Sequence, residues 1–97
     1  MKRNVRLSLK AKADLDDIWG HSLKEWGLER AEAYILTIHS IINLIDQFPA
    51  MAKNAENIRP GLLKYPIGSH VLFLRIGDKS IDIVRILHQR MDYPKHL

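Results

Sequence analysis

The last part of the 97-residue chain gathers the side chains best suited to acid-base chemistry. A segment that contains Arg85 is followed by four basic residues: His88, Arg90, Lys95 and His96. Cleavage of RNA without a metal needs a general base, a general acid and a cation for the charged phosphate, and His, Tyr, Arg and Lys can fill these roles. The same residues can also be structural, with Arg85 paired to Asp82 or Asp92. The residues alone leave both interpretations open.

Other catalytic chemistries find no support in the sequence. The chain has no cysteine, which excludes disulfides, thiolate zinc sites and a cysteine nucleophile. Its five histidines never stand at the His-x-x-x-His spacing, and its five glycines form no phosphate-binding loop. Ser69 precedes His70, but neighbouring strand residues point to opposite faces. We therefore expect no metal, no cofactor and no catalytic residue of these classes.

The charge is unevenly distributed along the chain. Residues 1–12 carry five Lys or Arg and no acid, whereas residues 13–58 carry three basic and eight acidic residues. Residues 59–97 carry seven basic and three acidic residues, so the net charge of +4 hides two basic ends and an acidic middle. Such asymmetry favours an acidic partner for the basic ends.

Hydrophobic spacing predicts a strand followed by two helices. Residues 5–9 alternate between apolar and polar types, as in a half-buried strand. Ser8 can cap a helix that Gly27 ends, and a second helix should stop before Pro49. With so short a link, the two helices must lie antiparallel. We expect six of their residues to belong to the core: Leu15, Ile18, Trp19, Trp26, Ile38 and Ile45.

The second half of the chain predicts a meander. After a loop over 49–61, turns at 66–69 and 77–80 separate three strand-like segments: 62–65, 70–76 and 81–88. The last of these has apolar residues on both faces, so it should lie centrally or be covered on both sides. The element order predicts one α+β domain over residues 1–97, with two layers and the helical hairpin on one sheet face.

The sequence also bears on location. The first residues are basic like the start of a signal peptide, but Ser8 and Lys10 interrupt the apolar stretch that must follow. The apolar run at 71–74 is far shorter than the roughly 18 residues that cross a bilayer. We therefore predict a soluble, cytoplasmic protein that does not bind membranes.

Several segments stand out as motifs: Arg59-Pro60-Gly61, Gly68 to Arg75, Ile83 to Asp92, and His96-Leu97. The string Arg85-Ile86-Leu87-His88-x-Arg90-Met91-Asp92 is the most specific part. Together with Ala13 to Trp19 and the strand-helix-helix-meander order, these segments resemble the ParE toxins of bacterial type II toxin-antitoxin systems. The likeness spans nearly the whole chain.

The resemblance implies the RelE/ParE fold, in which the helical hairpin packs on an antiparallel sheet ordered by sequence. ParE-like toxins act on DNA gyrase, stall its cleaved complex and block replication, without catalysing a reaction themselves. RelE-like relatives on the same fold instead cut messenger RNA in the ribosome, and fold alone cannot separate the two activities. A decayed toxin that acts only as a binding module is the third interpretation.

The resemblance also implies partners. A ParD-like antitoxin should hold the chain inactive in a hetero-oligomer of two plus two chains or larger, its acidic tail wrapping the basic segments. The target would be DNA gyrase, without direct sequence-specific binding of nucleic acid. We expect seven residues to contact antitoxin or target: Arg59, His70, Arg75, Arg85, His88, Arg90 and Asp92.

Overall fold

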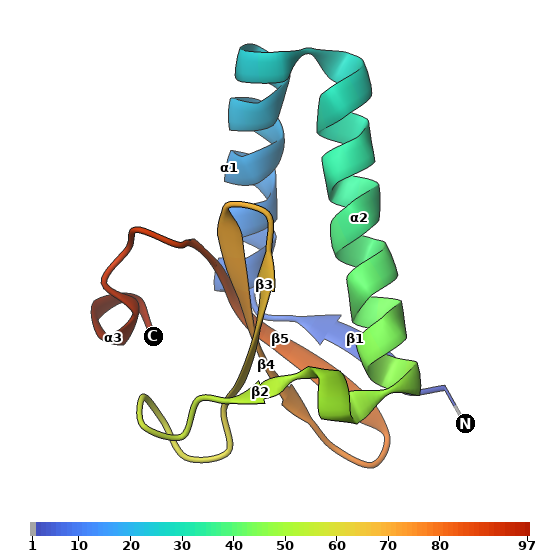
Figure 1. Ribbon diagram of the computed structural model, residues 1–97, viewed down its shortest axis with the longest axis vertical. Helices are drawn as coiled ribbons and strands as arrows, with labels where there is room; N and C mark the ends of the chain where they lie inside the picture. Colours follow the sequence, from blue (N-terminus) through green and yellow to red (C-terminus); the bar gives the residue numbers. More distant parts are fainter. Residues whose placement is uncertain (1) are drawn as a thin grey trace.

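The computed structural model describes residues 2–97 and consists of a helical hairpin standing on a five-stranded sheet (Figure 1). The elements in chain order are β1 (Asn4–Leu7), α1 (Leu9–Trp26), α2 (Leu28–Gln47), η1 (Pro49–Met51), β2 (Lys53–Asn54), β3 (Leu63–Ile67), β4 (His70–Ile76), β5 (Ser80–His88) and α3 (Tyr93–His96). The predicted α+β class is confirmed.

Ser8 and Gly27 set the two ends of α1, as the sequence predicted. The Ser8 hydroxyl accepts the amide N–H of Ala11 at 2.9 Å and caps α1. Gly27 adopts a φ of +86°, which favours glycine, and separates the two helices by a single residue. Its N–H donates to the carbonyl of Leu23, and its own carbonyl accepts the N–H of Ala31. One glycine therefore ends α1 and starts α2.

The sheet has the strand order β1-β5-β4-β3-β2. The predicted meander is present, since β3, β4 and β5 pair antiparallel in sequence. The expected order by sequence is wrong for β1, which lies beyond β5 and runs parallel to it. The reason is the long connection between β1 and β5, which contains the helical hairpin and the first strands of the meander. A connection of this length allows two strands to pair in parallel, which a tight turn does not.

Both faces of the sheet are covered by the chain itself. The face under the hairpin packs Ile38, Ile45, Leu72 and Ile83 in the larger core. The opposite face holds a smaller core of Ala55, Leu62, Phe73 and Leu87, against which Tyr93 and Leu97 pack. The apolar residues on both faces of β5 thus serve two cores within one chain.

A bulge allows β5 to serve both cores. Leu74 pairs with Ile83 and Phe73 pairs with Arg85, so Val84 is an extra residue on β5. Strand side chains alternate between faces, so residues three apart share a face only when an extra residue intervenes. Ile83 and Ile86 accordingly both enter the larger core, while Val84 packs against the smaller one.

The structure differs from several expectations. Trp26 is 46% exposed, because the end of α1 extends past the sheet (Figure 1). The ring of Tyr34 on α2 lies beside it, with centroids 6.1 Å apart. Trp19 and Leu15 are partly buried, whereas Ile18, Ile38 and Ile45 are buried.

The loop and turn regions also differ from the prediction. The expected loop over 49–61 contains η1 and the two-residue strand β2, and the short helix α3 was not expected. The predicted turn at 66–69 is shorter, since β3 continues through Pro66 to Ile67. β2 pairs only with Leu63 and Lys64, so the outer edge of β3 is free at Pro66, where proline is tolerated. No helix in residues 2–97 is long and apolar enough to cross a membrane.

Gly68 in the β3–β4 turn should be intolerant of substitution. It has a φ of +56°, and a Cβ there would lie 2.8 Å from the Tyr34 ring. Gly68→Ala should therefore lower the free energy of unfolding, measured in urea, by about 1–3 kcal/mol. Gly20→Ala is the matched control, because a Cβ at this helical position meets nothing within 4 Å. This change should raise the free energy of unfolding by about 0.5–1 kcal/mol. Equal effects of the two changes would contradict the Tyr34 contact.

Candidate functional site

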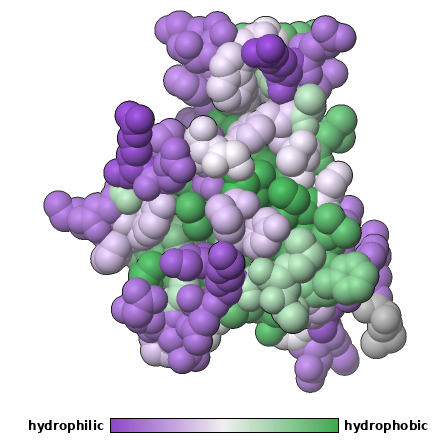
Figure 2. All heavy atoms as spheres, in the orientation of Figure 1, coloured by the Kyte–Doolittle hydropathy of each residue, from purple (hydrophilic) through white to green (hydrophobic). Residues whose placement is uncertain are grey.

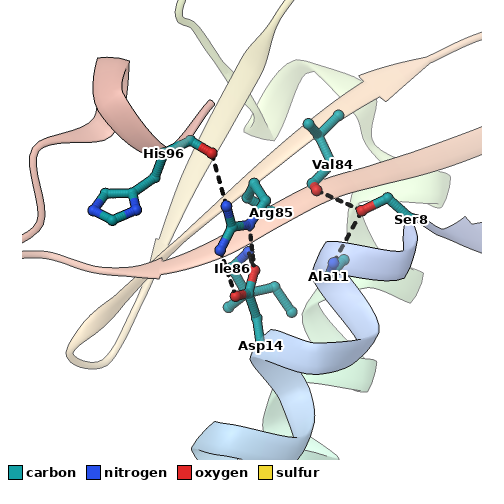
Figure 3. Close-up of polar contacts among 7 residues, drawn as sticks. All are labelled: Ser8, Ala11, Asp14, Val84, Arg85, Ile86 and His96. Carbon is teal, nitrogen blue, oxygen red and sulfur yellow. Dashed lines mark hydrogen bonds and ion pairs between the residues drawn. The ribbon is translucent and has the colours of Figure 1, made fainter.

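A group of hydrogen-bonded side chains joins α1 to β5 (Figure 3). Arg85 donates from Nε and from its terminal nitrogen to the two carboxylate oxygens of Asp14, at 2.8 and 2.7 Å. The same carboxylate accepts the backbone N–H of Ile86 at 2.9 Å. The Arg85 and Asp14 side chains are only 16% and 11% exposed, so this bidentate pair is largely removed from water.

The position of this ion pair follows from the short first strand. β1 ends at Leu7, opposite Ile83, and leaves the rest of the β5 edge without a strand partner. The Ser8 hydroxyl donates to the carbonyl of Val84 at 2.7 Å, and Asp14 accepts from Ile86 (Figure 3). The first turns of α1 therefore satisfy backbone groups that a longer strand would have paired.

The structure corrects the interpretation of Arg85. Neither expected partner binds it, because Asp82 pairs with Arg6 at 2.7 Å across the β1–β5 ladder and Asp92 lies beyond the end of β5. The hydrogen bonds that Arg85 donates to Asp14 raise the pKa of Arg85 above its ordinary value. Arg85 also donates to the carbonyl of His96 at 2.7 Å and so holds the C-terminal segment. It is a structural residue rather than a free contact.

A second group of polar residues surrounds a groove beside α1. His70 and His88 are cross-strand partners with ring centroids 5.4 Å apart. The groove has a volume of about 310 Å³ and is lined by Asp14, Asp17, Ile18, His21, His70, Ile86, His88 and Met91. We call it the histidine groove. Within residues 2–97, no three His, Cys, Asp or Glu side chains are placed to hold a metal ion.

Hydrogen bonds fix the tautomers of both histidines. The Tyr34 hydroxyl donates to the carbonyl of Ile67 at 2.9 Å and lies 2.7 Å from Nδ1 of His70. Because a hydroxyl has one hydrogen, Nδ1 of His70 must donate to it, which leaves Nε2 as an acceptor. Nδ1 of His88 accepts the N–H of Arg90, so a neutral His88 carries its proton on Nε2. Burial, and then His88 and His21, lower the pKa of His70.

Arg59 lies in a different, basic groove. This groove has a volume of about 290 Å³ and is lined by Ser8, Leu9, Lys10, Arg59, Val84, Arg85, His96 and Leu97. Leu9 is 84% exposed at its rim. The Asp14–Arg85 pair separates the two grooves, since Asp14 lines the histidine groove and Arg85 lines the basic groove.

The remaining expected contact residues lie apart from one another. Arg75 is on β4, opposite Asp82 and near the β4–β5 turn. Arg90 is exposed in the turn after β5, and the exposed Asp92 precedes α3. The structure therefore brings together His70 with His88, and Arg59 with Arg85, but it does not join the seven residues into one site.

Sequence reasoning missed the residues of α1 that line the histidine groove, and Tyr34 of α2, which bonds to His70. Asp14, Asp17 and His21 are spaced three and four apart and so share one face of α1 with Ile18. That spacing could have predicted that the three side chains lie together. The sequence did not single out Tyr34, because its ring lies among the apolar residues that predict the buried face of α2.

Comparison with known proteins decides the family. Residues 5–93 match the model of the ParE toxin of the type II toxin-antitoxin system parDE. The chain is 45% identical over 92 residues to Toxin ParE1 of Caulobacter vibrioides, covering 95% of both chains. It is 39% identical to Toxin ParE1 of Mycobacterium tuberculosis over the full length of both. The chain belongs to the ParE toxin family.

Solved structures show that ParE and RelE toxins share this fold. The chain of the chromosomal ParDE system from P. aeruginosa superposes with a TM-score of 0.73 at 24% identity, covering 89% of this chain and 95% of that one. The RelBE2 toxin-antitoxin complex from Mycobacterium tuberculosis gives a TM-score of 0.63 at 20% identity, covering 92% and 100%. The RelE/ParE fold implied by the sequence is confirmed.

Removing the carboxylate of Asp14 should destabilise this ParE-family domain strongly. Asp14→Ala leaves Arg85 without its counter-ion and the Ile86 N–H without its acceptor, so urea unfolding should show a loss of about 3 kcal/mol. Asp14→Asn should cost roughly half as much, since its amide oxygen can still accept from Ile86.

The exposed neighbour Asp16 provides the control for this prediction. Asp16→Ala should change the free energy of unfolding by less than about 0.5 kcal/mol. If Asp14→Ala lowered the free energy of unfolding as little as Asp16→Ala, the Asp14–Arg85 pair would add nothing to stability.

His70 should make stability depend on pH. Its pKa is lowered in the folded state, so the unfolded chain binds the proton more readily and stability should fall as pH drops below about 6.5. Measured by urea unfolding, the free energy of unfolding should fall less between pH 7.5 and pH 5.5 in His70→Gln than in the wild type. His39→Gln, at an exposed position of α2, controls for the removal of a histidine. If the free energy of unfolding of His70→Gln fell as much as that of the wild type, His70 would not be the source of the pH dependence.

Proposed function

We propose that this ParE-family toxin inhibits DNA gyrase, stalling the cleaved complex and blocking replication in the cytoplasm. It does so as one domain over residues 1–97, without a cofactor and without catalysing a reaction. Family membership supports the proposal through relatives named Toxin ParE1 at 45% and 39% identity. The observation that carries the choice against the ribonuclease is the composition of the histidine groove.

The histidine groove is poorly suited to RNA. Its paired rings could supply an acid and a base, but the lining holds the carboxylates of Asp14 and Asp17 and no Lys or Arg. A phosphodiester would be repelled there, and its transition state would lack a stabilising cation. The guanidinium of Arg85, which touches the lining residue Asp14, is held in the ion pair with that carboxylate. The geometry therefore favours a binding role.

Tyr93 is equally unsuited to acid-base catalysis. Its ring packs on Phe73 with centroids 5.0 Å apart, and its hydroxyl donates to the carbonyl of Gln89 at 3.0 Å. Both features hold the side chain in the smaller core. The His70–His88 pair, as two neighbouring titratable rings, keeps ribonuclease activity as the second candidate.

We also propose that a ParD-like antitoxin neutralises this chain in a hetero-oligomer of two plus two chains or larger. The solved neighbours include toxin-antitoxin complexes. Lys10 and Arg59 in the basic groove offer cations to an acidic tail, whereas Arg85 is engaged by Asp14. Exposed apolar residues offer further contact area on α2 and directly after it: Leu36, Leu44 and Phe48. Figure 2 shows hydrophobic atoms gathered where α2 ends and η1 follows.

Parallel assays on the purified, antitoxin-free chain test the target. We expect inhibited gyrase supercoiling with accumulated cleaved DNA, and intact messenger RNA with or without ribosomes. Arg90→Ala should weaken the inhibition more than His88→Gln, because a binding surface needs the exposed charge and no proton transfer. A ribonuclease would instead lose roughly 10²- to 10⁴-fold of its cleavage on replacement of His88.

Each other outcome of these assays has a definite meaning. RNA cut at defined positions while gyrase runs normally would replace the gyrase proposal by the ribonuclease. Neither activity, from a sample that unfolds cooperatively, would favour a decayed toxin that retains only antitoxin binding.

A further inference from the structure

The histidine groove contains two acceptors without a partner. Among residues 2–97, Asp14 is fully engaged by Arg85 and Ile86, but the carboxylate of Asp17 makes no hydrogen bond or ion pair. Nε2 of His70 likewise has no partner, because Tyr34 takes only Nδ1. Asp17 is an exposed residue of α1, and Nε2 of His70 is not a buried unpaired atom, so solvent reaches both. The groove therefore presents two acceptors without a partner beside one donor, the Nε2–H of His88.

The rest of the lining is apolar or aromatic. Ile18 and Ile86 are buried core residues that close the floor, and Met91 stands 44% exposed at the side. The His70 and His88 rings meet edge to face at 81°, and both residues line the groove. An occupant must combine an apolar stem with a head that donates hydrogen bonds.

We propose that the histidine groove binds an arginine side chain presented by a partner protein. The guanidinium would donate to Asp17 and to Nε2 of His70, and its methylene stem would lie against Ile18, Ile86 and Met91. Arginine fits better than lysine because its planar head offers five donors, stacks on aromatic rings and is more weakly hydrated.

Other occupants fit less well. An anionic side chain would face Asp14 and Asp17 with no cation in the lining. A purely apolar side chain would cover the two acceptors and leave them unsatisfied. The inference goes beyond the gyrase proposal and does not depend on it, because it concerns the chemistry of one groove and not the identity of the target.

An NMR titration of the full chain tests the proposal. The probe is Nα-acetyl-arginine methylamide, and the readout is the ring Cε1–H signals of the five histidines at pH 7.5. We expect saturable shifts of His70 and His88 with a dissociation constant on the order of millimolar. His39 and His96 lie outside the groove and should not shift. The corresponding norleucine compound, which has the stem without the head, should bind at least roughly tenfold more weakly.

A matched pair of variants separates the groove from general charge attraction. Asp17→Asn should weaken arginine binding roughly tenfold, whereas Asp16→Asn, which removes the same charge outside the groove, should leave it within about twofold. Equal effects of the two variants, equal binding of norleucine, shifts of His39 as large as those of His70, or no saturable shift in a folded sample would each overturn the proposal.

Discussion

The carboxylate of Asp14 is the contact on which the arrangement of this ParE-family domain depends. It accepts two hydrogen bonds from Arg85 and one from the Ile86 backbone, and so anchors α1 to an edge of β5 that β1 is too short to cover. Arg85 in turn holds the carbonyl of His96. One ion pair thus connects the hairpin on one face of the sheet with the C-terminal segment that covers the other.

The same pair divides the functional surface. Asp14 contributes negative charge to the histidine groove, and Arg85 contributes to the basic groove that contains Lys10 and Arg59. Two neighbouring sites of opposite character result, and each favours a different kind of group: donors with positive charge in the first, and carboxylates in the second.

Local signals predicted the elements well where a single residue type has a clear physical effect. Ser8, Gly27 and Pro49 marked the helix limits because a side-chain acceptor, a positive φ and a missing N–H each act locally. Prediction failed for Trp26, whose position on the apolar stripe is correct but whose turn of helix extends past the sheet. Periodicity specifies which side of a helix is apolar, and it does not specify where the opposing layer ends.

The sequence by itself determined the two helices, the meander and the family, since spacing, capping residues and an extended resemblance are all readable along the chain. Only the tertiary structure decided which acid binds Arg85: Asp14 lies 71 residues away in sequence, while Asp82, three residues away, is taken by Arg6. Only the sheet register placed His70 beside His88, and only the packing of α1 brought Asp17 to them. Partners distant in sequence are set by how the layers meet, and local patterns carry no information about that meeting.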